Sequence, residues 1–149
     1  MAPRREQILR LATAFREAIE DALKAGDLPL VAEDGEFFNG FPRGACGPAS
    51  VLLAAFLAEN GVSSPSVVNG GTSPEDFHTW VQAEGFAIDV TGDQFPGVPS
   101  TVVAGDGVPS PFALHNRLRK GGSLVSGRTA LAKKHADFAA CYEAIERHL

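Results

Sequence analysis

The hydrophobic pattern of the chain predicts helices at both ends and one in between. Apolar residues recur in steps of three and four near the start of the sequence: Ile8, Leu11, Phe15, Ala18, Ile19 and Leu23. This stripe predicts an amphipathic helix over residues 5–24, ending near Gly26. Residues 47–60 are apolar on most sides, so we expect a second helix there, central and buried. A last helix is expected over about 133–148, with one apolar side made of Phe138, Cys141, Tyr142, Ile145 and Leu149.

The middle of the chain alternates apolar and polar residues, which is typical of strands. Residues 77–83 and 86–91 predict a β-hairpin with the two-residue turn Glu84-Gly85. The segment SVVNGG, residues 66–71, predicts a short strand followed by a glycine turn, and one possible further strand lies at 101–104. With no repeat and no linker, the 149 residues predict one α+β domain over 1–149. Its central helix packs on a small antiparallel sheet, and the two end helices cover it.

Composition narrows the possible partners. The net charge of −5 argues against nucleic acid, and no apolar run approaches the ~18 residues of a membrane span. The two cysteines, Cys46 and Cys141, form no CxxC pair and no zinc-ligand spacing, so we expect free thiols in a reducing cytoplasm. Neither a metal site nor an organic cofactor is expected, because ligand spacing and phosphate-cradling glycine motifs are both missing.

Cys46 lies where the segment FPRGACGPAS turns into the second predicted helix. A helix N-terminus and a nearby imidazolium both stabilise a thiolate, whose ordinary pKa is about 8.5. The backbone N–H of Cys46 or Gly47 is a candidate donor to a developing oxyanion. Cys46 is therefore either a buried small residue or a nucleophile, depending on what lies near it.

The hairpin supplies a base and an acid on one face. Pairing through Glu84-Gly85 puts the following residues on that face: His78, Trp80, Gln82, Ala87, Asp89 and Thr91. His78 and Asp89 are diagonal neighbours, with Cα atoms roughly 7–8 Å apart and within reach of a hydrogen bond. Cys46 would attack, His78 would take and return the proton, and Asp89 would fix the imidazole tautomer. Trp80 is expected as a wall of the site or as a core aromatic.

These motifs resemble those of papain-like and transglutaminase-like cysteine enzymes. HTWVQAEGFAIDVTGDQF is similar to the HAW-V…D-T strand pair of bacterial transglutaminase-like proteins, and FPRGACGPAS to a nucleophile loop that often reads CGDAS. Pro48 stands in place of that aspartate. The resemblance covers about residues 37–95. It implies a papain-like core, catalytic Cys46, His78 and Asp89, and acyl transfer on an amide or thioester. Papain-like sites often add a side-chain amide to the oxyanion hole, and the candidates for it here are Asn39 and Gln94.

The sequence leaves several functions open. A cysteine hydrolase or acyltransferase of the peptidase, deamidase or transglutaminase-like type would act on a peptide, a protein or a small amide. The alternative is a catalytically silent peptide- or protein-binding module, and a deamidating toxin would use the same three residues. Asp93 is expected as a turn former or a substitute acid. The remaining histidines show no partner pattern and are expected at the surface: His115, His135 and His148.

Overall fold

The computed structural model describes residues 3–28, 31–32, 35–36, 38, 40–71, 77–112, 115, 118–131 and 136–149. Its α-helices there are α1 (Arg4–Lys24), α2 (Cys46–Glu59) and α4 (Ala136–Glu146), and its short 3-10 helices are η2 (Gly92–Gln94) and η4 (Arg128–Ala130). Among these residues, no helix combines the length and the hydropathy that crossing a bilayer requires.

The strands form a five-stranded antiparallel sheet and a small separate pair within the described ranges. The sheet contains β3 (Ser66–Gly71), β4 (Phe77–Ala83), β5 (Phe86–Asp89), β6 (Val102–Ala104) and β7 (Leu118–Leu124), in the order β6-β5-β4-β3-β7. The separate pair joins β1 (Val31–Ala32) and β2 (Gly35–Glu36). The expected mixed α+β class with an antiparallel sheet is confirmed.

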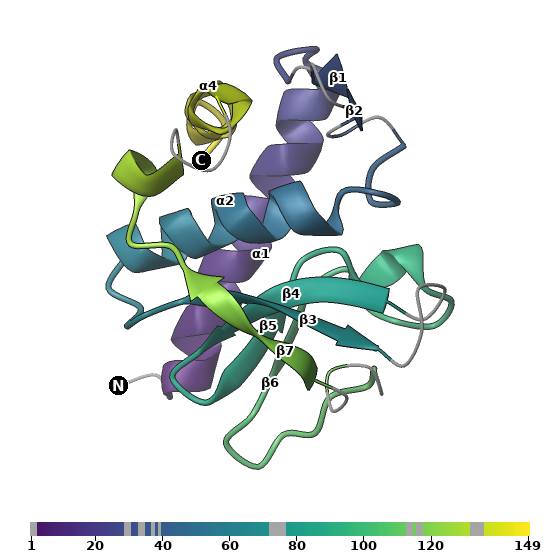
Figure 1. Cartoon of the computed structure of the whole chain (residues 1–149), viewed down its shortest axis with the longest axis vertical. Coiled ribbons are helices and arrows are strands. Elements are labelled where there is room, and N and C mark those ends of the chain that lie inside the picture. The colour runs from purple at the N-terminus through teal and green to yellow at the C-terminus, as the bar shows by residue number, and fades with distance from the viewer. Residues whose placement is uncertain are drawn as a thin grey trace.

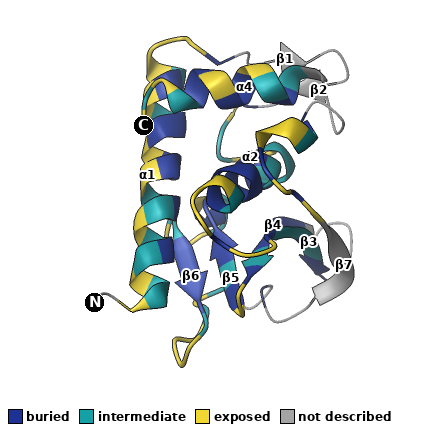
Figure 2. Ribbon diagram, turned by 90° about the vertical axis from the view of Figure 1, so that its left-hand side faces the viewer, coloured by how far each residue is buried: buried dark blue, intermediate teal, exposed yellow. Residues whose placement is uncertain are grey.

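The helices gather on one side of the sheet, with α2 innermost (Figure 1). Figure 2 shows α2 buried on almost every side between the sheet and the two outer helices, as its apolar sequence predicts. The three helices meet through aromatic rings: Phe15 of α1 stacks on Phe56 of α2 at 5.0 Å and lies 6.5 Å from Tyr142 of α4. Burial of these rings fixes α2, and with it the position of Cys46 at its first turn.

Most expected boundaries hold within two or three residues. The hairpin register is confirmed, with Val81 opposite Ile88 and Ala83 opposite Phe86. The second hairpin strand ends at Asp89 instead of residue 91, because the chain turns there into η2. The last helix occupies 136–146 of the described residues, and Leu149 lies beyond its end and is exposed. Strand β7, at residues 118–124, was not predicted.

Candidate active site

Cys46 is the first residue of α2, at the positive end of the helix dipole. The cap position is Ala45, which offers no side-chain acceptor, so the first N–H groups of the helix are not claimed by a capping side chain. Gly47 follows within the same turn. Cys46 is half-buried, whereas Ala45 before it is fully buried. The start of α2 is therefore anchored in the core while Cys46 stays partly accessible.

His78 connects this sulfur to an acid. It lies near the start of β4, and its interaction with the Cys46 thiol shifts the pKa of both groups. Its Nε2 atom donates to Oδ2 of Asp89 over 2.6 Å, and both side chains are completely buried. Because Nε2 faces Asp89, only Nδ1 can exchange a proton with the sulfur, and the Gln94 side-chain amide also lies 3.0 Å from Nδ1. The three residues come from α2, β4 and β5, and they converge at one end of the sheet.

The pKa directions of Cys46 and His78 both favour the charged form of the group. Burial opposes the charged form of Cys46, but the hydrogen bond to His78 and its charge lower the thiol pKa below its ordinary value. Burial likewise opposes protonation of His78, but the hydrogen bonds to Asp89 and Cys46 raise its pKa to about 9. Near neutral pH these shifts favour a thiolate beside an imidazolium, the reactive state of a cysteine nucleophile.

Asp89 is held ionised by four donors. Burial alone would raise the pKa of its carboxyl group, but hydrogen bonds from His115 and His78 hold that pKa well below its usual range. Oδ1 accepts the backbone N–H of Thr91 at 2.9 Å and its hydroxyl at 3.3 Å. A buried carboxylate with this many donors keeps both its charge and its orientation.

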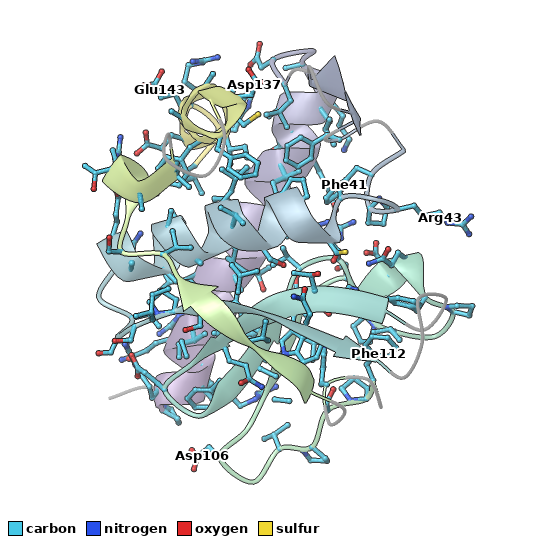
Figure 3. All side chains as sticks on the ribbon, viewed as in Figure 1. Phe41, Arg43, Asp106, Phe112, Asp137 and Glu143 are labelled. Carbon is cyan, nitrogen blue, oxygen red and sulfur yellow. The ribbon has the colours of Figure 1, made fainter. Side chains whose placement is uncertain are left out.

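Aromatic rings exclude water from the far side of His78. Phe95 and Phe112 both meet its ring edge to face, at 5.0 and 5.4 Å between centroids. In Figure 3, Phe112 lies below the sheet, on the opposite side of it from Phe41 and the start of α2. The low polarity around His78 strengthens its hydrogen bonds to Asp89 and Cys46.

Comparisons with known proteins do not link this geometry to a family. The chain matches no protein-family model, no curated protein and no solved structure. The likeness to papain-like and transglutaminase-like enzymes therefore stays a hypothesis based on the residues of the site itself.

The residues expected to bind the oxyanion or the substrate differ in how close the structure places them to His78 and Cys46. The Gln94 amide lies 3.0 Å from Nδ1 of His78, so it is close to the atoms that would react. Gly47 follows Cys46 in the first turn of α2. Trp80 is fully buried behind His78, and its indole N–H has no acceptor in the described part of the chain. Asn39 and His135 lie outside the described residues.

His115 corrects the sequence interpretation most clearly. It was expected at the surface, but its side chain is 1% exposed, and its Nε2 donates to Oδ2 of Asp89 over 2.8 Å. Asp89 lies 26 positions earlier in the sequence, so no local pattern predicts that it pairs with His115. The only signal in the sequence was Phe112, an apolar neighbour three residues before. His148 instead pairs with Asp27 near the surface, at 2.6 Å.

Asp93 belongs to a different contact from the one considered in the sequence. Arg16 of α1 binds both its carboxylate oxygens, at 2.7 and 2.8 Å, and donates to the Val90 carbonyl at 2.7 Å. The same guanidinium lies 4.6 Å from the Phe41 ring. Arg16 is almost fully buried and so ties the loop before Cys46 to the η2 turn that carries Gln94.

One group of described residues has ligand atoms close enough to hold a metal: His78, Asp89 and His115, all within 4.8 Å of one another. The contacts to Oδ2 of Asp89, at 2.6 and 2.8 Å, are hydrogen-bond lengths. Donor atoms around a tetrahedral zinc ion lie roughly 3.3 Å apart. These distances fit a hydrogen-bonded cluster better than a coordination sphere.

Gly92 leads to the first prediction. A Cβ atom at this position would lie 2.5 Å from the Pro99 carbonyl oxygen and 2.7 Å from Cγ1 of Val98. Gly92→Ala should therefore displace η2 and lower the free energy of unfolding by roughly 1–3 kcal/mol, as measured by urea denaturation. Gly47→Ala, whose Cβ meets nothing within 4 Å, is the control for stability alone. Equal stabilities of the two variants would contradict the close approach at Gly92.

Proposed function

We propose that this protein is a cysteine-dependent hydrolase or acyltransferase that acts on an amide, with Cys46 as nucleophile, His78 as acid and base, and Asp89 as the acid partner. The observation that carries the proposal is the placement of a buried, hydrogen-bonded His78–Asp89 pair beside Cys46 at the start of α2. It is supported by the lowered thiol pKa of Cys46 and the raised imidazole pKa of His78. A cysteine with only a packing role has no need of either shift.

The reaction follows from these positions. The Cys46 thiolate attacks the amide carbonyl carbon, and the N–H groups at the start of α2 together with the Gln94 amide are suited to stabilise the oxyanion. The C–N bond then breaks, the His78 imidazolium gives its proton to the leaving amine, and a thioester remains on the sulfur. Water or an acceptor amine attacks the thioester, His78 takes its proton, and Cys46 is released as a thiolate.

The exposure of the three residues limits the substrate. His78 and Asp89 are fully buried, so a substrate approaches only over the partly exposed sulfur. Figure 3 shows Arg43 pointing outwards near this approach. A narrow group fits such an opening, which favours a peptide tail, a protein loop or a small amide over a folded surface. With the same hypothesis we assign the fold to a papain-like or transglutaminase-like core and the reaction to the cytoplasm, where both free thiols stay reduced.

The pH dependence of alkylation tests the proposal. Iodoacetamide should modify Cys46 with a midpoint on the acid side of that of an ordinary thiol, because His78 lowers the pKa of the Cys46 thiol. The matched control is the exposed cysteine introduced by Ser126→Cys, with Cys46 replaced by serine. Cys141 should stay unmodified, because it is fully buried and burial, together with nearby Asp137, raises its pKa to about 12. Mass spectrometry distinguishes the three sites.

His78→Ala should move the Cys46 midpoint back toward that of the control cysteine. If the wild-type midpoint already coincides with the control, the thiolate is not activated and the proposal is wrong. A silent binding module would then be the better interpretation of the same fold.

A further inference from the structure

Two histidines donate to the same oxygen atom of Asp89. His78 reaches Oδ2 from β4 at 2.6 Å, and His115 reaches it at 2.8 Å from the segment that follows β6. The mechanism proposed above uses only His78. His115 is nevertheless almost as completely enclosed as His78 and Asp89, with its ring 4.9 Å from that of Trp80. His115 is a second buried imidazole at this point, and a role as a polar surface residue cannot explain its burial.

A serine fixes the orientation of His115. The Ser110 hydroxyl lies 2.6 Å from Nδ1 of His115, and it accepts the backbone N–H of Phe112 at 3.0 Å. Because the Asp89 carboxylate can only accept, Nε2 of His115 carries a proton. In the neutral ring Nδ1 is then the acceptor of the Ser110 hydroxyl proton, for which the Phe112 carbonyl at 3.1 Å competes. The hydrogen bonds therefore run from Ser110 through His115 to Asp89, and from Asp89 back to His78.

We propose that His115 is a positioning residue of the active site, which holds Oδ2 of Asp89 against Nε2 of His78 and so maintains the imidazolium beside Cys46. The proposal rests on the function proposed above. Thr91 donates only to Oδ1, so without His115 the carboxylate would lose one of the two donors to Oδ2 and would be held less firmly in its orientation. A rotated carboxylate would no longer be in line with His78, and the Cys46 thiolate would lose its counter-charge.

The charged and titratable groups around this cluster come from five elements. In the described part of the chain they are Cys46 of α2, His78 of β4, Asp89 of β5, and the ion pair between Arg16 of α1 and Asp93 of η2, which contacts the backbone just beyond Asp89. The Arg16–Asp93 pair is internally neutralised. Changes at His115 should therefore reach Cys46 through Asp89 and His78.

A cavity beside His115 makes the proposal testable by chemical rescue. His115 and Ser110 line a cavity of about 350 Å³ under the sheet, together with Gln82, Ala87, Ala104 and Val108. In His115→Ala the space of the lost ring would join this cavity, so free imidazole can enter it and donate to Asp89. In His115→Phe a ring of similar size fills the space but offers no donor.

The experiment measures the rate of Cys46 alkylation by iodoacetamide at about pH 8, where free imidazole is mostly neutral. Loss of a hydrogen bond to a charged group should shift the pH midpoint of Cys46 alkylation in both His115→Ala and His115→Phe. Below that shifted midpoint, both variants should react about tenfold more slowly than wild type. Added imidazole should restore most of the rate in His115→Ala alone. His115→Gln, whose amide N–H replaces that of Nε2, should stay close to wild type in rate and midpoint.

Each outcome has a definite meaning. Unchanged midpoints in folded His115→Ala and His115→Phe would overturn the positioning role, and so would a rate in His115→Gln equal to that in His115→Phe. If the alanine variant does not fold, the comparison of glutamine with phenylalanine decides alone. Slow, unactivated Cys46 in the wild type would overturn the proposed function itself, whereas activated Cys46 with no effect at His115 would overturn only this inference.

Discussion

Cys46→Ala should abolish acyl transfer and leave the fold intact. The sulfur is the only atom in the proposed mechanism that forms a bond to the substrate, so its loss should cost at least about a thousandfold in rate. Its side chain is partly exposed and alanine is a good helix former, so the free energy of unfolding should change little. Turnover of 4-nitrophenyl acetate and urea denaturation measure the two quantities on the same sample.

Cys141→Ala is the matched control, since it removes the other thiol of the chain. Cys141 is fully buried on α4, so its loss should lower the free energy of unfolding by about 1–2 kcal/mol and leave turnover unchanged. Turnover that survives in Cys46→Ala would show that the ester is cleaved elsewhere, and the proposed nucleophile would be wrong.

Asp89→Asn should lower turnover by about 10³–10⁴-fold, because an amide can neither balance the imidazolium nor accept all four donors. It should also change the pH dependence. The pKa of His78 in the folded protein, about 9, lies above its ordinary 6.5. The stabilisation gained from its protonation is therefore fully present below about pH 6.5 and is lost as the pH rises through about 9. Wild-type turnover should fall over the same upper range, where His78 can no longer protonate the leaving amine.

Without the carboxylate charge, the pKa of His78 should drop, and turnover should decline at a lower pH. The control is Asp93→Asn, which removes a carboxylate only four positions away that binds Arg16 and not His78. Turnover of Asp93→Asn should fall with rising pH over the same range as in the wild type. If turnover fell over the same pH range in the wild type, Asp89→Asn and Asp93→Asn, the role of Asp89 would be contradicted. Circular dichroism spectra would confirm that the variants are folded.

The sequence predicts those parts of the fold that depend on local pattern. The apolar stripe of α1 and the continuous apolar surface of α2 are strong periodic signals. The hairpin turn fixes the pairing of β4 with β5, so the meeting of His78 and Asp89 follows from counting residues back from Glu84-Gly85.

Contacts between segments distant in the sequence escape such reasoning. Strand β7 contains Gly121 and Gly122 and has no alternation, so its pairing with β3 depends on an open sheet edge and not on its own pattern. His115 and Arg16 were missed for a related reason. Each is a polar residue whose burial is explained only by a partner more than twenty positions away.

The hold of Arg16 on both the Phe41 loop and Asp93 has a practical consequence for protein engineering. The segment with recognisable motifs spans about residues 37–95, which suggests a minimal unit that could be excised or transplanted into another scaffold. Such a fragment would lack the Arg16 guanidinium, which contacts both Phe41 in the loop before Cys46 and Asp93 in η2. Any shortened or grafted version must therefore keep the N-terminal helix or supply a substitute cation in its place.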